Sequence, residues 1–258
     1  MQLPFQLLVK GKEVLGVAHI PLQHKDDICV YILCYGLNGH RVDEHRMGYK
    51  LGIIGESTNN PVFRFDYRNA GVSAGSFEDS SLKDREEDVL RVIAFVKSCY
   101  PNSKISLVGY SDGAKVAAAV AEKSKDVTAL VLWNPIMAVP DNDSDCEPVS
   151  STNTTKFVLH PVSKKPVASI YGLWFGTKLL TELKNDTTYS KLASATYPLL
   201  CVFGEKDLHT QNIREAIISD SQFMAHTEIC IIPEAGHTFN GYEQDLHVIE
   251  KTLRWQNE

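Results

Sequence analysis

The chain has 258 residues, of which 43% are hydrophobic and 22% are charged, and both fractions are ordinary for a folded globular protein. A chain of this length can bury one sizeable core, so we expect one main domain rather than a disordered protein. The formal net charge of -6 argues against a nucleic-acid partner, because phosphate backbones are held by clustered Lys and Arg residues that this sequence does not show.

The first ten residues lack the basic start and the long apolar run of a secretory signal, and no later stretch has the length of a membrane span. The sequence therefore predicts a cytoplasmic protein without a membrane-spanning segment. No close-spaced CxxC pair occurs among the six cysteines. Four of them fall in short apolar runs typical of buried strands: Cys29, Cys34, Cys201 and Cys230. We expect reduced, buried thiols, and neither a metal site nor an organic cofactor.

Strand and helix patterns alternate along the chain. Alternating segments at 5–9 and 14–20 flank Gly11 and predict an opening antiparallel hairpin. Continuous apolar runs, as required for strands buried on both faces of a mostly parallel sheet, follow at 28–34, 62–65, 105–108, 129–133, 199–203 and 229–232. Helical apolar spacing occurs between them at 47–54, 89–96 and 114–121. This order predicts an α/β fold with its functional loops at the carboxyl ends of the strands.

One stretch of about sixty residues, 135–197, breaks this alternation, and connections of such length are functional or disordered. Its part 141–155 is polar and rich in turn-forming residues, whereas 170–183 is aromatic and predicts an amphipathic helix. We interpret 135–197 as a cap inserted into a core domain made of 1–134 and 198–258.

Three aromatic side chains of this cap are candidates for substrate binding: Tyr171, Trp174 and Phe175. Ligand pockets are mostly apolar, and these rings would line such a pocket. The alternative interpretation is that they only attach the cap to the sheet.

The candidate nucleophile is Ser111. The apolar run 105–108 leads directly into Gly109-Tyr110-Ser111-Asp112-Gly113, and an alanine-rich helical pattern follows. A G-x-S-x-G motif between a buried strand and a helix presents its serine on a sharp turn, where side chains in place of the glycines would clash. The alternative is a strand-to-helix turn without a catalytic role.

A serine hydroxyl needs an adjacent base, and the base needs a carboxylate that orients it. In this strand-turn-helix setting the chain order is serine, acid, histidine. His237 follows the last apolar run in Pro233-Glu234-Ala235-Gly236-His237 and is the predicted base. His209 precedes that run and His247 lies in a C-terminal helical pattern, so neither has the expected position.

The predicted acid is Asp207, in the Gly204-Glu205-Lys206-Asp207 segment that follows the run 199–203. Its alternative role is to cap a helix that begins near Thr210. Glu205 is the competing carboxylate.

Acyl transfer also needs two N–H donors for the oxyanion. The residue after the nucleophile, Asp112, supplies one, and the loop Tyr35-Gly36-Leu37-Asn38-Gly39-His40 supplies the other. Leu37 is the predicted second donor by its position.

Together these motifs resemble the α/β-hydrolase superfamily, within the bacterial cinnamoyl-esterase, lipase-like and serine aminopeptidase-like hydrolases. The segment 64–73, RFDYRNAGVS, is similar to the family's F-D-x-R-G-x-G-x-S. Tyr35-Gly36 replaces the usual His-Gly pair before the oxyanion hole, and Asn69-Ala70 replaces Gly-His. The resemblance implies an α/β-hydrolase fold and acyl transfer through a seryl ester.

We therefore predict a serine esterase that acts on a small or medium-sized ester without a metal or cofactor. A thioesterase or acyltransferase, acting on a carrier-bound or coenzyme A-linked acyl group with the same residues, is the close alternative. A noncatalytic ligand-binding protein on the same scaffold is the alternative of a different class. The sequence carries no signal for an oligomeric state.

Overall fold

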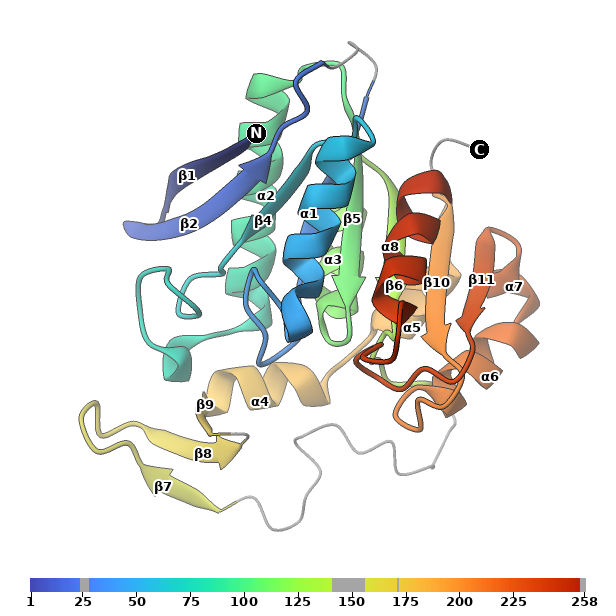
Figure 1. Ribbon diagram of the computed structural model, residues 1–258. Coiled ribbons are helices and arrows are strands. Elements are labelled where there is room, and N and C mark those ends of the chain that lie inside the picture. Colours follow the sequence, from blue (N-terminus) through green and yellow to red (C-terminus); the bar gives the residue numbers. More distant parts are fainter. Residues whose placement is uncertain (24–27, 141–155, 171, 256–258) are drawn as a thin grey trace.

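The computed structural model describes residues 1–23, 28–140, 156–170 and 172–255. Its centre is an eight-stranded sheet with helices on both faces (Figure 1). In spatial order the strands are β1 (Gln2–Val9), β2 (Lys12–His19), β4 (Val62–Phe65), β3 (Cys29–Cys34), β5 (Lys104–Tyr110), β6 (Val127–Trp133), β10 (Leu199–Gly204) and β11 (Thr227–Ile232). The hairpin β1–β2 and the pair β2–β4 are antiparallel, and all other pairs are parallel. The predicted α/β architecture is confirmed.

The helices divide between the two faces of the sheet. On one face lie α1 (Met47–Ser57) and α8 (Gln244–Trp255), which contact each other. The other face is covered by α2 (Leu82–Cys99), α3 (Gly113–Lys123), α6 (Gln211–Ser219) and α7 (Ser221–Met224). Two short 3-10 turns, η1 (Glu44–Arg46) and η2 (Phe77–Asp79), lie in the loops.

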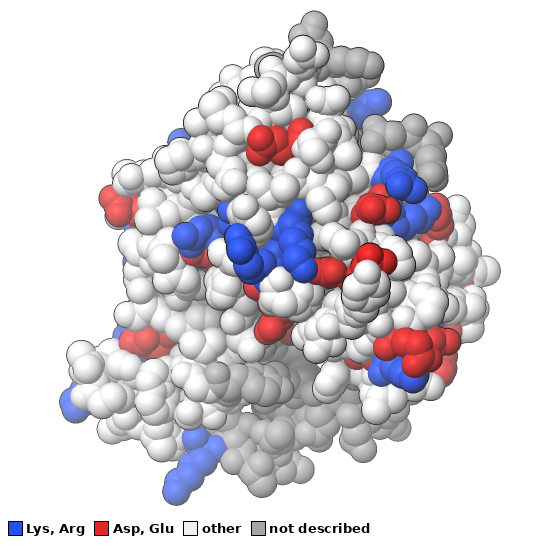
Figure 2. All heavy atoms as spheres, viewed as in Figure 1, with Lys and Arg blue, Asp and Glu red and all other residues white. Residues whose placement is uncertain are grey.

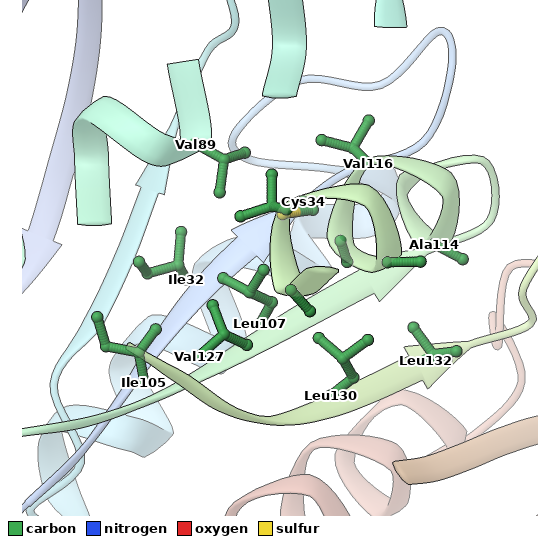
Figure 3. Packing of buried hydrophobic residues seen from close by; sticks show 14 of the residues in the cluster. Ile32, Cys34, Val89, Ile105, Leu107, Ala114, Val116, Val127, Leu130 and Leu132 are labelled. Atoms are coloured by element: carbon green, nitrogen blue, oxygen red, sulfur yellow. The ribbon is translucent and has the colours of Figure 1, made fainter. Parts of the chain in front are cut away.

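Successive residues of the central strands belong to opposite cores. In β3, Tyr31 and Leu33 pack under α1 and α8, whereas Ile32 and Cys34 pack under α2 and α3. Figure 3 shows Ile32 and Cys34 beside side chains of β5, β6 and the covering helices. A strand with a core on each face needs an apolar residue at every position, which is why these runs lack polar alternation.

The last strand differs from this expectation. The run 229–232 predicts a strand buried on both faces, but β11 is the edge of the sheet, and Ile231 is 44% exposed. Its residues Ile229 and Cys230 are only partly buried. An apolar run reports β propensity, whereas burial depends on the neighbouring strand that an edge lacks.

The described cysteines of the predicted strands are free thiols. Burial raises the pKa of Cys34 and of Cys201 to about 12, so both remain protonated and unreactive. Cys29 and Cys230 are less deeply buried than the sequence predicts.

The insertion between β6 and β10 contains its own antiparallel sheet, made of β7 (Phe157–Leu159), β8 (Pro166–Ile170) and β9 (Leu173–Gly176). Two helices follow, α4 (Thr177–Lys184) and α5 (Thr188–Ala193). In Figure 1 the hairpin β7–β8 projects from the rest of the molecule. Residues of α5 belong to the main core beside α3, so the end of the insertion returns to the sheet.

The predicted amphipathic helix over 170–183 is therefore wrong in its first part. The helix begins only at Thr177, and the residues before it form β9. Gly172 has a φ of +77°, which turns the chain back between β8 and β9. Trp174 and Phe175 then alternate between a partly exposed and a buried position. The polar segment 141–155 and Tyr171 lie outside the described residues.

Charges are mixed on the surface. On the face drawn in Figure 2, basic and acidic side chains are interspersed around one small basic group near the middle. Among the described helices, none has the length and apolar character needed to cross a bilayer.

Candidate active site

Ser111 lies on the turn between β5 and α3, with a φ of +54°. Such a conformation is strained for a residue with a side chain and persists only where the surroundings hold it. The Ser111 N–H donates to the Trp133 carbonyl at 2.9 Å. A β-carbon on Gly113 would overlap the Cys34 carbonyl oxygen, and one on Gly109 would lie 2.9 Å from the Ala114 Cα. Both glycines of the motif are therefore needed for the turn.

His237 lies beside Ser111, although 126 residues separate them in the chain. Its Nε2 is 3.0 Å from the Ser111 Oγ, and its Nδ1 is 2.7 Å from the Asp207 Oδ2. The imidazole stacks on the Tyr110 ring at 5.9 Å, and the Tyr110 hydroxyl donates to the His237 carbonyl at 3.1 Å. These contacts hold one ring nitrogen toward the hydroxyl and the other toward the carboxylate.

Asp207 is buried and accepts several hydrogen bonds. Besides His237, the Thr210 hydroxyl donates to Oδ2 at 2.7 Å and the His209 N–H donates to Oδ1 at 3.0 Å. Burial alone would raise the pKa of Asp207, but the hydrogen bonds and the charge of His237 outweigh it and lower the pKa below its usual value. Asp207 thus binds the turn before α6 and the imidazole at the same time.

The competing residues lie elsewhere. The Glu205 side chain is exposed, and its Oε2 accepts from the Glu234 N–H at 2.9 Å. His247 is exposed on α8. The His209 ring packs edge-on against the His237 ring at 5.4 Å, so it is a neighbour of the site rather than a replacement for its base.

The loop after β3 lies against the serine. A β-carbon on Gly36 would be 3.2 Å from the Ser111 Cβ and 3.7 Å from its Oγ, so glycine allows this close approach. The Asp112 side chain accepts from Lys115 Nζ at 2.6 Å. Among the described residues, the N–H groups of Leu37 and Asp112 have no hydrogen-bond acceptor. Both are available to an oxyanion.

Asn134 is a residue that the sequence reasoning missed. It is fully buried, directly after β6, with a φ of +39°. Its Oδ1 accepts from the Gly204 N–H at 2.8 Å, and its Nδ2 donates to the carbonyls of His237 at 2.8 Å and Gly236 at 3.3 Å. One side chain thus connects the strand before Asp207 to the loop of His237. An asparagine at the carboxyl end of a buried strand was the available signal.

The described aromatic residues of the insertion take different positions. Phe175 is fully buried and packs edge-on against Phe77 at 5.1 Å, in an apolar cluster that includes Leu37 and Leu179. Its ring attaches the insertion to the core and presents no surface to a ligand. Trp174 is partly exposed, with His160 edge-on at 5.7 Å.

No group of three or more potential metal ligands occurs in the part of the chain that the structure describes. The geometry assembles a hydroxyl, an imidazole, a carboxylate and two free N–H groups. Such a set can perform acyl transfer with the protein's own atoms.

Known proteins that are similar to this chain share its fold. The family model for serine aminopeptidase, S33, matches residues 32–181. Curated protein sequences show no significant match. Est1E from Butyrivibrio proteoclasticus with bound ferulic acid is similar in structure, with a TM-score of 0.76 and 18% identity over 98% of this chain and 100% of that one.

Two further solved structures are similar over nearly their whole length. The esterase domain of a Rhodothermus marinus protein has a TM-score of 0.69 and 15% identity, covering 99% of this chain and 97% of its own. The thioesterase domain from the curacin biosynthetic pathway has a TM-score of 0.67 and 14% identity, covering 99% of this chain and 98% of its own. At such identities these likenesses concern the fold.

Proposed function

The chain belongs to the serine aminopeptidase S33 family of α/β hydrolases, and we propose that it cleaves a carboxylic ester through a seryl acyl-enzyme intermediate. One observation carries this proposal: the alignment of Ser111 Oγ, the His237 imidazole and the Asp207 carboxylate at 3.0 and 2.7 Å on a strained turn.

In the first half-reaction the Ser111 Oγ attacks the ester carbonyl while His237 Nε2 takes its proton. The carbonyl oxygen becomes an oxyanion, which accepts from the N–H groups of Leu37 and Asp112. His237 then gives its proton to the departing alkoxide, the carbon–oxygen bond breaks, and the alcohol leaves. Asp207 holds the imidazole in the required tautomer and stabilises its charged form.

The second half-reaction repeats these steps with water. His237 takes a proton from the water as it attacks the acyl-serine, and returns that proton to Ser111 Oγ when the carboxylic acid departs. The chemistry requires only groups that the chain itself supplies.

The same residues would serve a thioester or an acyl transfer, with a thiolate as leaving group or another hydroxyl as acceptor. The likeness to a thioesterase domain favours keeping this second candidate. The family description adds aminoacyl amides as a third substrate class.

We also propose that residues 135–197 act as a cap that selects the substrate. Support comes from the apolar cluster that Phe175 and Leu179 of the insertion share with Leu37. Leu37 directly follows Gly36, which approaches Ser111. The partly exposed ring of Trp174 is the candidate contact for an acyl group.

The test is a substrate panel with a labelling reagent. Matched esters and thioesters of increasing acyl length, and aminoacyl anilides, would be compared on the natural chain, Ser111→Ala and Ser98→Ala. Ser98 is an exposed serine of α2 and serves as the control. We expect a fluorophosphonate to label the natural chain and Ser98→Ala, but not Ser111→Ala. Equal labelling or turnover of a folded Ser111→Ala would refute the proposal, and absence of both from all proteins would favour a noncatalytic role.

A further inference from the structure

Arg85 of α2 is 1% exposed and lies beneath the loop that follows β3. Its Nη2 donates to the Leu37 carbonyl at 2.8 Å and its Nη1 to the Gly36 carbonyl at 3.4 Å. The guanidinium carbon is 5.0 Å from the centre of the Tyr67 ring. Arg85 is thus a buried cation whose main partners are two backbone carbonyls.

A guanidinium in this position is costly. Within the described ranges no carboxylate forms an ion pair with Arg85, and its Nε has no hydrogen-bond partner. Burying a charge without a counter-charge is unfavourable, and apolar residues of similar volume often fill such sites at no loss of stability. Two other arginines are buried, and they differ in their partners. The Arg68 Nε binds the Asp88 carboxylate at 2.5 Å, whereas Arg64 binds the His19 ring and the Arg41 carbonyl and, within the described ranges, forms no ion pair with a carboxylate. The cost of burying this guanidinium therefore favours a role other than stabilisation.

The orientation of the peptide groups suggests what Arg85 does. No cis peptide bond occurs in the described chain, and in a trans peptide the C=O and N–H point in opposite directions. A Gly36 carbonyl that faces Arg85 turns the Leu37 N–H away from Arg85. This same loop runs close to the nucleophile, because a β-carbon on Gly36 would lie 3.2 Å from the Ser111 Cβ. The Leu37 N–H has no acceptor among the described residues.

We propose that Arg85 is the positioning residue of the oxyanion hole: it holds the Gly36 and Leu37 carbonyls so that the Leu37 N–H faces the oxygen of the reacting carbonyl. The inference rests on the proposed function. The guanidinium charge also polarises the peptide that it binds, which strengthens the opposite N–H as a donor. Because full negative charge is present on the substrate oxygen only at the tetrahedral stage, the effect belongs to kcat rather than to KM.

The surroundings keep this arrangement rigid. The Leu82 N–H, in the first turn of α2, donates to the Glu182 Oε2 of α4 at 2.6 Å. Leu37 belongs to the same apolar cluster as Leu179 of helix α4. The insertion therefore contacts both the helix that carries Arg85 and the loop that Arg85 holds.

The experiment compares Arg85→Met and Arg85→Lys with Val89→Ala. Methionine keeps most of the volume without donors, and lysine keeps the charge with a different geometry. Val89 is a fully buried residue of the same helix, so its truncation destabilises α2 without touching the loop. For each folded variant we would measure kcat and KM on the best ester, the melting temperature, and the affinity of a trifluoromethyl ketone that forms a tetrahedral adduct with the serine.

For Arg85→Met we expect kcat to fall about ten- to a hundredfold, below the cost of deleting an oxyanion donor, while KM stays within about twofold. The ketone should lose affinity in proportion to kcat/KM. The kcat of Arg85→Lys should lie between those of the natural chain and Arg85→Met. Val89→Ala should have the kcat of the natural chain when both are assayed below the melting temperature of the variant.

An unchanged kcat in folded Arg85→Met, or an equal kcat loss in Val89→Ala, would overturn the inference. If Arg85→Met does not fold, Arg85→Lys decides: kcat and ketone affinity equal to those of the natural chain would also overturn it. These failures differ from failure of the proposed function, which would appear as turnover independent of Ser111.

Discussion

Replacing Asp207 by asparagine tests the assignment of the acid. The Asp207 Oδ2 accepts from His237 Nδ1 at 2.7 Å and from the Thr210 hydroxyl, which can also act as an acceptor. Oδ1 accepts from the His209 N–H, which can only donate and therefore requires an oxygen at this position. The amide of the Asp207→Asn variant would therefore turn its NH2 toward the imidazole. His237 would then carry its proton on Nε2, the nitrogen that must be free to accept the proton of Ser111.

The magnitude follows from the short contact. Two unit charges 2.7 Å apart interact by about 6 kcal/mol at an effective dielectric constant of about 20. This is an upper limit for the loss of imidazolium stabilisation, because both charges are delocalised. Since about 1.4 kcal/mol corresponds to a tenfold rate change, kcat should fall by about two to four powers of ten. Ser111→Ala and His237→Ala should cost at least as much.

The assay is steady-state hydrolysis of the best ester by folded Asp207→Asn and by the matched control Glu205→Gln. Glutamine can still accept from the Glu234 N–H, so the control should keep kcat within about twofold. Because the hydrogen bonds of Asp207 outweigh its burial and lower its pKa, this carboxylate stays ionised at mildly acidic pH, and a fall of turnover there reports the base rather than the acid. A larger loss in Glu205→Gln than in Asp207→Asn, or a turnover rate that does not change between about pH 8 and about pH 4, would refute this reasoning.

Three further changes test neighbouring parts of the structure. Asn134→Ala removes hydrogen bonds to Gly204, Gly236 and His237. We expect the free energy of unfolding, measured with urea, to fall by about 3 kcal/mol and kcat to decrease. An unchanged kcat would mean that Asn134 does not position the base. Trp174→Ala should alter the ranking among acyl chain lengths about tenfold, and an unaltered ranking in a folded variant would exclude this side chain as a selector. Burial raises the pKa of Asp43 to about 7, so the folded chain holds a proton that the unfolded chain releases above about pH 4. The free energy of unfolding therefore falls as the pH rises from about 4 to about 7. Asp43→Asn should remove a fall of about 3 kcal/mol between about pH 5 and about pH 8, and an identical pH dependence of urea unfolding in both proteins would contradict the role of this carboxyl.

In the inserted segment, the local sequence pattern did not determine the type of secondary structure. The residues 170–175 have apolar spacing compatible with either a helix or a strand, and the turn at Gly172 decided for a hairpin. In β11 the apolar run predicted the strand itself correctly, but its exposure depends on its place at the edge of the sheet. A short stretch of sequence does not specify which strands will lie beside it in the sheet.

The sequence by itself determined the α/β order and the turn at Ser111, because both depend on local rules: continuous apolar strands, helical spacing, and glycines where no β-carbon fits. It also placed Asp207 and His237 at the ends of the correct strands. Only the tertiary structure decided the distances between Ser111, His237 and Asp207, since residues far apart in the chain meet at one edge of the sheet. The same holds for the contacts of Asn134 and Arg85, whose partners are backbone carbonyls and N–H groups of distant loops. Every residue type carries a backbone carbonyl and nearly all carry an N–H, so the sequence does not show which of these groups a side chain will bind.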